Sequence, residues 1–231
     1  MLPPVIAVRS LSATRDGTLV DDISLEWYPA QFCAVRGEPG SGKELLLRLL
    51  SLSELADSGD VLVEGKLASA LDPGARAELR NHRFGFIFAA PFLLPSMTVL
   101  ENVAMPLFRI SHVEPAQARE RTRTLLDFIE MPDAAQASVD SLSPFSQHCV
   151  SLARALANEP AAVIVEELDG DMTAAERERF GGLLRAAARK FSSCVIAAVP
   201  AGFATQSDDR VIELAAGRVV GDSAALRELG A

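Results

Sequence analysis

The stretch "GEPGSGKE" at residues 37–44 carries the residue types that bind phosphate groups. It follows the pattern G-x-x-x-x-G-K-[ST], a loop whose backbone N–H groups surround nucleotide phosphates while a lysine contacts the terminal ones. The residues that fit are Gly37, Gly40, Ser41, Gly42 and Lys43. The last position departs from the pattern, because Glu44 stands where a hydroxyl would bind Mg²⁺. The motif therefore predicts a phosphate site that lacks one magnesium ligand.

The segments on either side of this loop predict the setting that the motif requires. An apolar strand at 31–37 precedes it, and the helical pattern "KELLLRLLSL" follows it. The N-terminus of such a helix adds a partial positive charge that favours anions. Similar apolar runs at 84–90, 161–167 and 193–200 predict further buried strands, so we expect an α/β core with a largely parallel sheet.

The rest of the chain predicts two smaller lobes around that core. More exposed strands of an antiparallel kind are expected at "PVIAVRSLSA", "DISLEW", "DVLVEG", "DRVIEL" and "GRVVGD". Helices are expected to begin at Gly42 and near Pro115, Ser146 and Thr173. The pattern between about 92 and 157 is mostly helical, which predicts an inserted helical lobe. Without repeats or a long linker, residues 1–231 are expected to form one domain.

Composition excludes several classes of function. The net charge is −9, and Lys and Arg are scattered, so no nucleic-acid partner is expected. No apolar run is long enough to cross a bilayer and the first residues lack a signal-peptide layout, which predicts a soluble, cytoplasmic protein. Cys33, Cys149 and Cys194 stand too far apart to suggest a zinc site and are expected to be buried. The three histidines, His82, His112 and His148, are expected at the surface.

Four later segments resemble, in order, the landmarks of ABC transporter ATPases. They are "FLLPSMTVLENVAMPL" (92–107), "LSPFSQHCVSLARALANEP" (142–160), "AAVIVEELDGDMT" (161–173) and "DRVIELAAGRVV" (209–220). Within that family the chain is most similar to the LolD and MlaF type, which drives lipoprotein release and intermembrane lipid transport. The resemblance implies a RecA-like P-loop core, an antiparallel β lobe and an inserted helical lobe.

The same resemblance implies cofactors, partners and a location. ATP and Mg²⁺ would be the cofactors, although the departures described next predict weak or absent binding. The partners would be an integral membrane permease and a second ABC subunit, identical or different. In the family two subunits hold two ATP molecules between one subunit's phosphate loop and the other's LSGGQ loop. The chain would lie on the cytoplasmic face of the inner membrane.

Around the nucleotide, the sequence departs from the family pattern at three positions. Where the family has an aromatic residue that stacks on adenine, this chain has Arg15, which can still stack on a base. Glu44 replaces the Mg²⁺ hydroxyl and is expected to pair with Lys43 or to lie at the helix N-terminus. Ala89 replaces a glutamine that reaches both the metal and the membrane subunit.

The signature loop "LSPFS" also departs from the family pattern. Pro144 and Phe145 replace the two glycines of LSGGQ, so one backbone donor is missing and a ring blocks close approach. Ser143 keeps the family's identity in the contact with the nucleotide across the dimer.

At the ends of two later strands, one catalytic residue is retained and three others are changed. Glu167 matches the family's catalytic base and could polarise a water. Glu166 replaces the aspartate that orients Mg²⁺. Pro200 replaces the residue that senses the γ-phosphate, and Thr173 replaces an aspartate that contacts the opposite subunit.

Together these departures predict a degenerate nucleotide-binding subunit that docks on a permease in a structural or regulatory role. Losing one preorganised group costs about 10²- to 10³-fold in rate, and groups that act together are not additive. Two alternatives remain. One is a slow but active ATPase that relies on Lys43 and Glu167, and the other is an interaction protein that binds no nucleotide.

Overall fold

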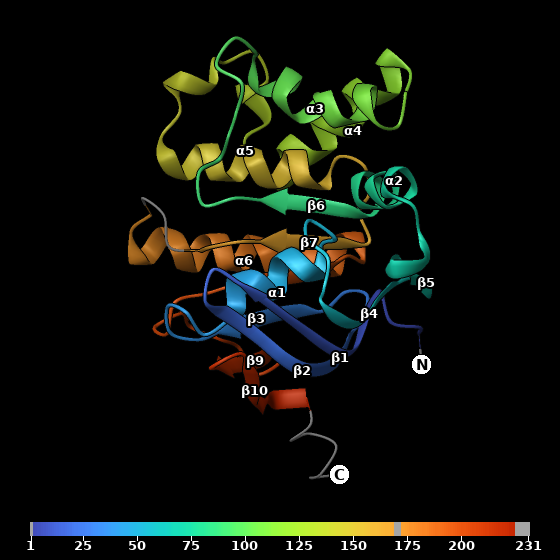
Figure 1. Cartoon of the computed structure of the whole chain (residues 1–231). Coiled ribbons are helices and arrows are strands. Elements are labelled where there is room, and N and C mark those ends of the chain that lie inside the picture. Colours follow the sequence, from blue (N-terminus) through green and yellow to red (C-terminus); the bar gives the residue numbers. More distant parts are fainter. Residues whose placement is uncertain (1, 169–171, 225–231) are drawn as a thin grey trace.

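The computed structural model describes residues 2–168 and 172–224 and confirms the α/β class (Figure 1). The structure contains a six-stranded sheet and a four-stranded sheet, and the helices between residues 99 and 156 lie at the top of that view. No helix among the described residues is both long and apolar enough to span a membrane.

The central sheet brings the carboxyl ends of its strands to one edge. Its strand order is β10 (Arg218–Asp222), β9 (Arg210–Ala215), β3 (Phe32–Arg36), β8 (Cys194–Ala198), β7 (Ala162–Val165) and β6 (Phe84–Ile87). All neighbouring pairs from β9 to β6 are parallel. In open parallel sheets, ligands bind beyond this edge.

One strand prediction was wrong in part. β9 was expected to be antiparallel and more exposed, yet it pairs in parallel with β3, and only its pairing with β10 is antiparallel. β9 alternates buried and exposed residues because it lies next to the edge strand of the sheet. An alternation of buried and exposed residues is also typical of antiparallel strands, which is why the sequence pattern led to the wrong prediction.

The second sheet confirms the prediction of antiparallel strands near the N-terminus. Its order is β2 (Thr18–Trp27), β1 (Ile6–Arg15), β4 (Ser58–Val63) and β5 (Lys66–Leu67). All of its pairs are antiparallel. β1 and β2 form a hairpin through Asp16 and Gly17, both of which have positive φ.

The helices fall into two groups. Three lie around the sheets: α1 (Lys43–Leu50), α2 (Pro73–Arg83) and α6 (Ala174–Phe191). The helical layer consists of α3 (Val99–Arg109), α4 (Pro115–Phe128) and α5 (Pro144–Leu156). Short 3₁₀ turns lie in connecting segments of the chain, at Ala68–Ala70, Pro132–Ala134 and Val139–Ser141. Capping boxes fix the starts of α3 and α6, with Thr98 and Thr173 as the N-caps.

Two hydrophobic cores lie on opposite faces of the central sheet. Alternate residues of each strand point to opposite faces, so Val163 and Val165 join the core beneath α5 and α6, while Ala162 and Ile164 join the core around α1. Five leucines of α1 are buried between the two sheets. This burial holds the start of α1 in place behind the phosphate loop.

The structure tests the predictions for histidine and cysteine. His148 was expected at the surface but is buried, and its ring lies 6.0 Å from that of Phe180. The prediction was wrong because the helical register of α5 places position 148 on the inner face, beside Cys149 and Leu152. The three cysteines are buried as expected.

Candidate functional site

The segment 37–43 forms a tight loop at the end of β3. Gly40 and Gly42 have φ values of 80° and 99°, a conformation that side chains rarely adopt. Gly42 is the N-cap of α1, and a Cβ atom on it would lie 2.3 Å from the Leu19 carbonyl oxygen. The β1–β2 hairpin therefore packs directly against the loop and fixes its shape.

Ser41 places an unused hydroxyl inside the loop. The side chain is buried, and its Oγ has no hydrogen-bond partner among the described residues. The backbone of Ser41 is held on both sides, since its N–H donates to Glu38 O at 2.9 Å and its carbonyl accepts from Gly217 N at 2.9 Å. A buried hydroxyl without a partner is costly, so this loop favours a ligand that can accept its hydrogen bond.

The lysine of the loop is already paired. Lys43 Nζ lies 2.8 Å from Glu44 Oε1, which confirms the expected ion pair. The Lys43 side chain is only 13% exposed, whereas that of Glu44 is 46% exposed. The carboxylate thus neutralises, from the solvent side, the one lysine that would contact the terminal phosphates.

Arg15, at the end of β1, is held by several partners. Its Nη1 donates to Asp57 Oδ1 at 2.8 Å, its Nη2 donates to Leu55 O at 2.6 Å, and its Nε lies 3.2 Å from Glu54 Oε2. These bonds occupy the edge of the guanidinium and tie β1 to the loop after α1. Stacking on a base, which uses the face of the guanidinium, remains a prediction.

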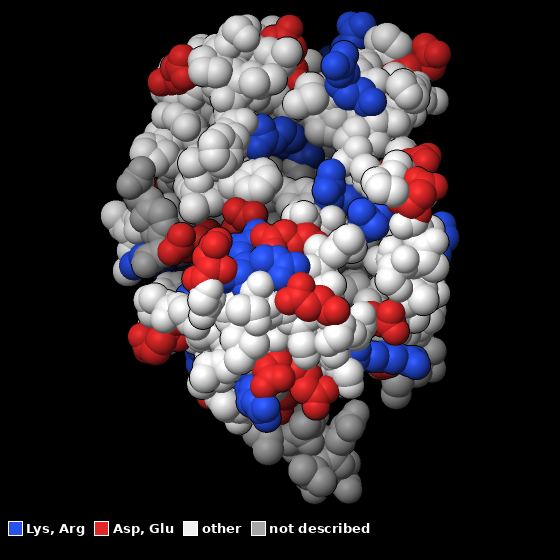
Figure 2. All heavy atoms as spheres, in the orientation of Figure 1, with Lys and Arg blue, Asp and Glu red and all other residues white. Residues whose placement is uncertain are grey.

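Glu54 and Arg48 extend this network, which no sequence pattern indicated. Arg48 Nε donates to Glu54 Oε1 at 2.5 Å. The positive charge of Arg48 also favours the ionised form of Glu166 and so acts to lower its pKa. Figure 2 shows basic and acidic side chains interleaved at the centre of this face. The positive charges of Arg15 and Arg48 are therefore compensated by carboxylates of the same chain.

Four positions lie at the carboxyl ends of β6, β7 and β8. Ala89 is exposed two residues after β6, and Glu167 is exposed two residues after β7. Glu166 is half-buried, and its backbone N–H donates to Ile87 O at 2.9 Å. Burial raises the pKa of Glu166, and the positive charge of Arg48 opposes that rise. Pro200 follows β8, so the fold brings these four positions to the same edge as Gly37.

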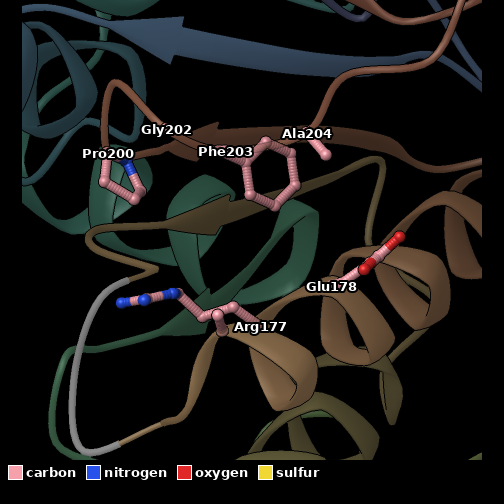
Figure 3. A pocket seen from close by; sticks show the side chains of 7 residues that line it. Arg177, Glu178, Pro200, Gly202, Phe203 and Ala204 are labelled. Carbon is pink, nitrogen blue, oxygen red and sulfur yellow. The ribbon is translucent and has the colours of Figure 1, made fainter.

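A pocket of about 400 Å³ opens beside Pro200 (Figure 3). Pro200, Gly202 and Phe203 form one wall, and Arg177 and Glu178 of α6 face them. The side chain of Pro200 contributes only carbon atoms to this wall.

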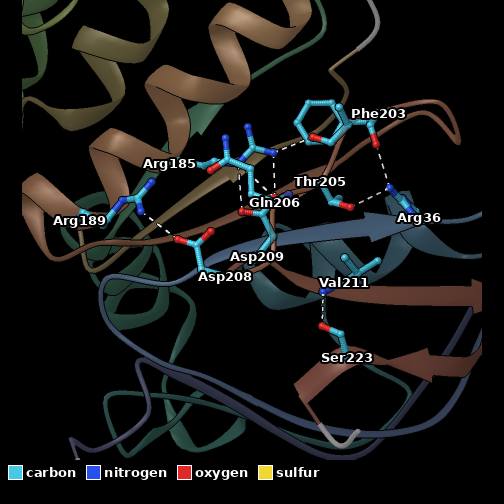
Figure 4. A network of polar contacts seen from close by, with 11 residues as sticks. Arg36, Arg185, Arg189, Phe203, Thr205, Gln206, Asp208, Asp209, Val211 and Ser223 are labelled. Atoms are coloured by element: carbon cyan, nitrogen blue, oxygen red, sulfur yellow. Dashed lines mark hydrogen bonds and ion pairs between the residues drawn. The ribbon is translucent and has the colours of Figure 1, made fainter. Parts of the chain in front are cut away.

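The loop after β8 is anchored by a buried ion pair (Figure 4). Arg185 Nη2 lies 2.8 Å from Asp209 Oδ2 and also donates to Ala204 O at 2.8 Å. Its guanidinium lies 5.0 Å from the ring centre of Phe32 and 5.2 Å from that of Phe203. Arg36, just before Gly37, donates to Phe203 O at 2.8 Å and so links this loop to the phosphate loop.

The signature positions lie at the start of α5, in the helical layer. Ser143 is the N-cap, and its Oγ accepts from Ser146 N at 3.2 Å. Pro144 is exposed in the first helical turn. Phe145 is half-buried and packs its ring 5.1 Å from the guanidinium carbon of Arg179. Ser143 through Phe145 thus belong to the helical layer, whereas the phosphate loop follows β3 of the central sheet.

The residues fit the phosphates of a nucleotide better than they fit its metal ion. The glycines with positive φ, the buried hydroxyl of Ser41 without a partner among the described residues and the N-terminus of α1 suit an anion. No group of three or more metal-ligating side chains occurs among the described residues, and the Mg²⁺ hydroxyl is replaced by a carboxylate that is bonded to Lys43. Thr173 is the N-cap of α6, and its Oγ1 accepts a hydrogen bond from Glu176 N at 3.3 Å.

This loop, edge and helical layer define a nucleotide-binding cassette. The chain belongs to the ABC transporter family, whose ABC transporter model matches residues 20–169. It is 30% identical over 225 residues to the lipoprotein-releasing system ATP-binding protein LolD of Hyphomonas neptunium, covering 95% of this chain and 98% of that protein. It is 31% identical over 222 residues to an uncharacterised ABC transporter ATP-binding protein of Mycobacterium tuberculosis, covering 94% of this chain and 89% of that one.

Solved structures show the same fold. CbiO1 of Clostridium perfringens, part of the complex CbiONQ, superposes with a TM-score of 0.87 at 20% identity, covering 99% of this chain and 92% of that one. The cassette MJ0796, a dimer bound to ADP and Pi, superposes with a TM-score of 0.79 at 22% identity, covering 94% and 97%. These likenesses confirm the predicted ABC cassette fold.

Proposed function

We propose that this family member is a degenerate nucleotide-binding subunit whose ATP hydrolysis is lost or strongly reduced. The observation that carries the proposal is the ion pair between Lys43 and Glu44, at the position where the family places the Mg²⁺ hydroxyl. A carboxylate there competes with phosphate for the lysine and repels the phosphates. Binding of ATP and Mg²⁺ is therefore weak or absent.

The departures at the strand ends and in the signature loop support the same proposal. Ala89 and Pro200 cannot contact a metal or phosphate through their side chains, and Pro144 lacks the backbone donor of a glycine. A dimer with an identical or different ABC subunit would place these changes in two composite sites. Each site would miss at least one group that hydrolysis requires, so both would be slow.

The role that remains is docking on an integral membrane permease, through the segment from Pro91 to Leu107. Phe92 and Leu94 are exposed there, and Phe108 is exposed just beyond it. Exposed apolar side chains of this kind mark interaction surfaces. Likeness to LolD favours lipid or lipoprotein transport, on the cytoplasmic face of the inner membrane.

Steady-state ATP turnover of the purified transporter complex tests the loss of hydrolysis. We expect little turnover, with no significant further loss in Glu167→Gln. Turnover that disappears in Glu167→Gln would instead support the alternative of a slow but active ATPase. That second candidate is favoured by the exposed position of Glu167 at the strand edge.

A membrane-binding assay tests the docking segment. Leu93 is unsuitable for a charged substitution, because it packs against the core of the helical layer. Leu94 is 39% exposed, so Leu94→Glu is expected to release the subunit from the permease without lowering the melting temperature. Undiminished co-purification of Leu94→Glu with the permease would refute the docking role. A melting temperature that ATP leaves unchanged would favour the third candidate, an interaction protein that binds no nucleotide.

A further inference from the structure

The phosphate loop keeps the groups that serve the first two phosphates of a nucleotide. In loops of this type, backbone N–H groups surround the α- and β-phosphates. Gly40 and Gly42 give the loop the curved backbone that this requires, with φ values of 80° and 99°. No side chain of the described residues caps the N-terminus of α1, so the N–H groups of its first turn face a site that suits an anion. The backbone part of the site is therefore retained.

Ser41 adds a buried donor inside the same loop. It is only 5% exposed, and its Oγ has no hydrogen-bond partner in the described part of the chain. A Cβ atom placed on Gly37 would lie 2.3 Å from this Oγ, so the hydroxyl is turned inward across the start of the loop. An unpaired hydroxyl in a buried position is costly, and an oxygen of a phosphate held in the loop would accept its hydrogen bond.

The groups that serve the third phosphate and the metal ion are changed or occupied. The lysine of such a loop reaches the β- and γ-phosphates, and the next residue supplies a hydroxyl to Mg²⁺. Here Lys43 Nζ lies 2.8 Å from Glu44 Oε1, and Glu44 takes the place of the hydroxyl. Ala89 and Pro200, at positions that the family resemblance assigns to the metal and the γ-phosphate, have no polar side-chain atom. The losses therefore concern the terminal phosphate and the metal, and not the first two phosphates.

The charge of Glu44 acts in the same direction. Its side chain is 46% exposed and lies on the solvent side of Lys43. Because the carboxylate neutralises the lysine, a third phosphate gains little from Lys43 and is repelled by Glu44. At 4 Å in water, repulsion between two unit charges corresponds to about fivefold in affinity. Mg²⁺ would screen this repulsion, but no group of three or more metal-ligating side chains occurs in the part of the chain that the structure describes.

We propose that the phosphate loop binds a nucleoside diphosphate without Mg²⁺, and that Glu44 excludes the third phosphate. The inference rests on the proposed function, a subunit with little or no hydrolysis, and names the ligand of the same site. The backbone N–H groups and the Ser41 hydroxyl hold the two phosphates, and the face of the Arg15 guanidinium stacks on the base. Glu44 acts as the specificity-determining residue. The site thus holds a ligand that has no γ-phosphate to lose.

Titration calorimetry with the full-length chain identifies the ligand. ADP, ATP and inorganic pyrophosphate are each titrated in EDTA and in Mg²⁺. In EDTA we expect ADP to bind about fivefold tighter than ATP. ADP should also bind tighter than pyrophosphate, which has no base to stack on Arg15. Mg²⁺ should weaken the binding of ADP, because the ion associates with ADP in solution and the loop offers it no set of ligands.

The contrary results separate the inference from the proposed function. Pyrophosphate that binds as tightly as ADP would overturn the role of the nucleoside. Binding of ADP that Mg²⁺ tightens, or no binding of ADP, would overturn the inference and leave the loss of hydrolysis standing. ATP that binds tighter than ADP when Mg²⁺ is present would overturn both the inference and the proposed weak binding of ATP and Mg²⁺.

Three substitutions test the assigned residues. Glu44→Gln removes the carboxylate charge and should tighten ATP binding more than ADP binding, which abolishes the preference. Glu120→Gln, the matched control, removes an exposed carboxylate of α4 and should leave the ratio of the two affinities unchanged. Ser41→Ala should weaken ADP and ATP alike, by about tenfold.

A preference for ADP that survives Glu44→Gln would refute the role of Glu44. Binding of ADP that Ser41→Ala leaves unchanged would refute the contact with the Ser41 hydroxyl. The comparison of ADP with ATP on the unmodified chain remains decisive if a variant proves unstable.

Discussion

Replacing Glu44 should restore part of the affinity for nucleotide, and the size of the gain follows from the ion pair with Lys43. At the observed separation of 2.8 Å the attraction is about 1.5 kcal/mol in water and about 6 kcal/mol at an effective dielectric constant of 20. Glu44 is 46% exposed, so the lower end applies, and exposed pairs contribute about 0.2–1 kcal/mol net. Repulsion between Glu44 and a phosphate at 4 Å adds about 1 kcal/mol in water.

Removing both effects should tighten nucleotide binding by about tenfold. Titration calorimetry with ATP, with and without Mg²⁺, measures the gain in three variants. Glu44→Gln removes only the charge and should tighten binding equally in both conditions, whereas Glu44→Ser adds the missing hydroxyl and should gain more with Mg²⁺. Glu44→Ala controls for loss of the side chain. Tight binding by the unmodified chain that none of these changes affects would refute the reasoning.

Three further predictions concern stability and reactivity. Asp209→Ala should lower the free energy of unfolding, measured in urea, by about 3–5 kcal/mol, because it leaves the buried charge of Arg185 without its carboxylate partner. Asp208→Ala, in the exposed pair with Arg189, should lower it by less than about 1 kcal/mol. Burial raises the pKa of Cys33 and of Cys149 to about 12, so thiol reagents at pH 8 should label them only after unfolding. Burial raises the pKa of Glu166 in the folded state above its ordinary value of 4.5, so the free energy of unfolding should fall as pH rises above 4.5 and the carboxyl ionises. Glu166→Gln removes this titration and should make the free energy of unfolding less dependent on pH in that range.

The core strands and the phosphate loop were predictable because their signals are local. A run such as "AAVIV" is apolar at every position, which only a strand buried on both faces requires. The pair of Lys43 with Glu44 was predictable for the same reason, since the two residues are adjacent at a helix start. By contrast, the partners of Arg15 lie about 40 residues along the chain, and no sequence pattern joins them.

The two errors have a common physical origin. The pairing of β9 with β3 joins residues roughly 180 positions apart, and the exposure pattern of β9 reflects its distance from the sheet edge rather than its direction. His148 was misplaced because a polar residue type was weighed above the register of the helix that carries it. In both cases the way the element packs against its neighbours decided a feature that residue type alone did not specify.

The helix α5 joins the signature positions to the segment that is proposed to dock on the permease. Ser143 caps its start, where the signature positions lie. Arg154 in its last turn donates hydrogen bonds to the carbonyl oxygens of Pro91 and Phe92. These 13 residues span about 20 Å as a rigid rod. This one helix, whose buried face packs in the core, therefore connects the signature positions with the segment that follows β6. Pro144 and Phe145 lie at one end of that helix, and Arg154 with its contacts to Pro91 and Phe92 lies at the other.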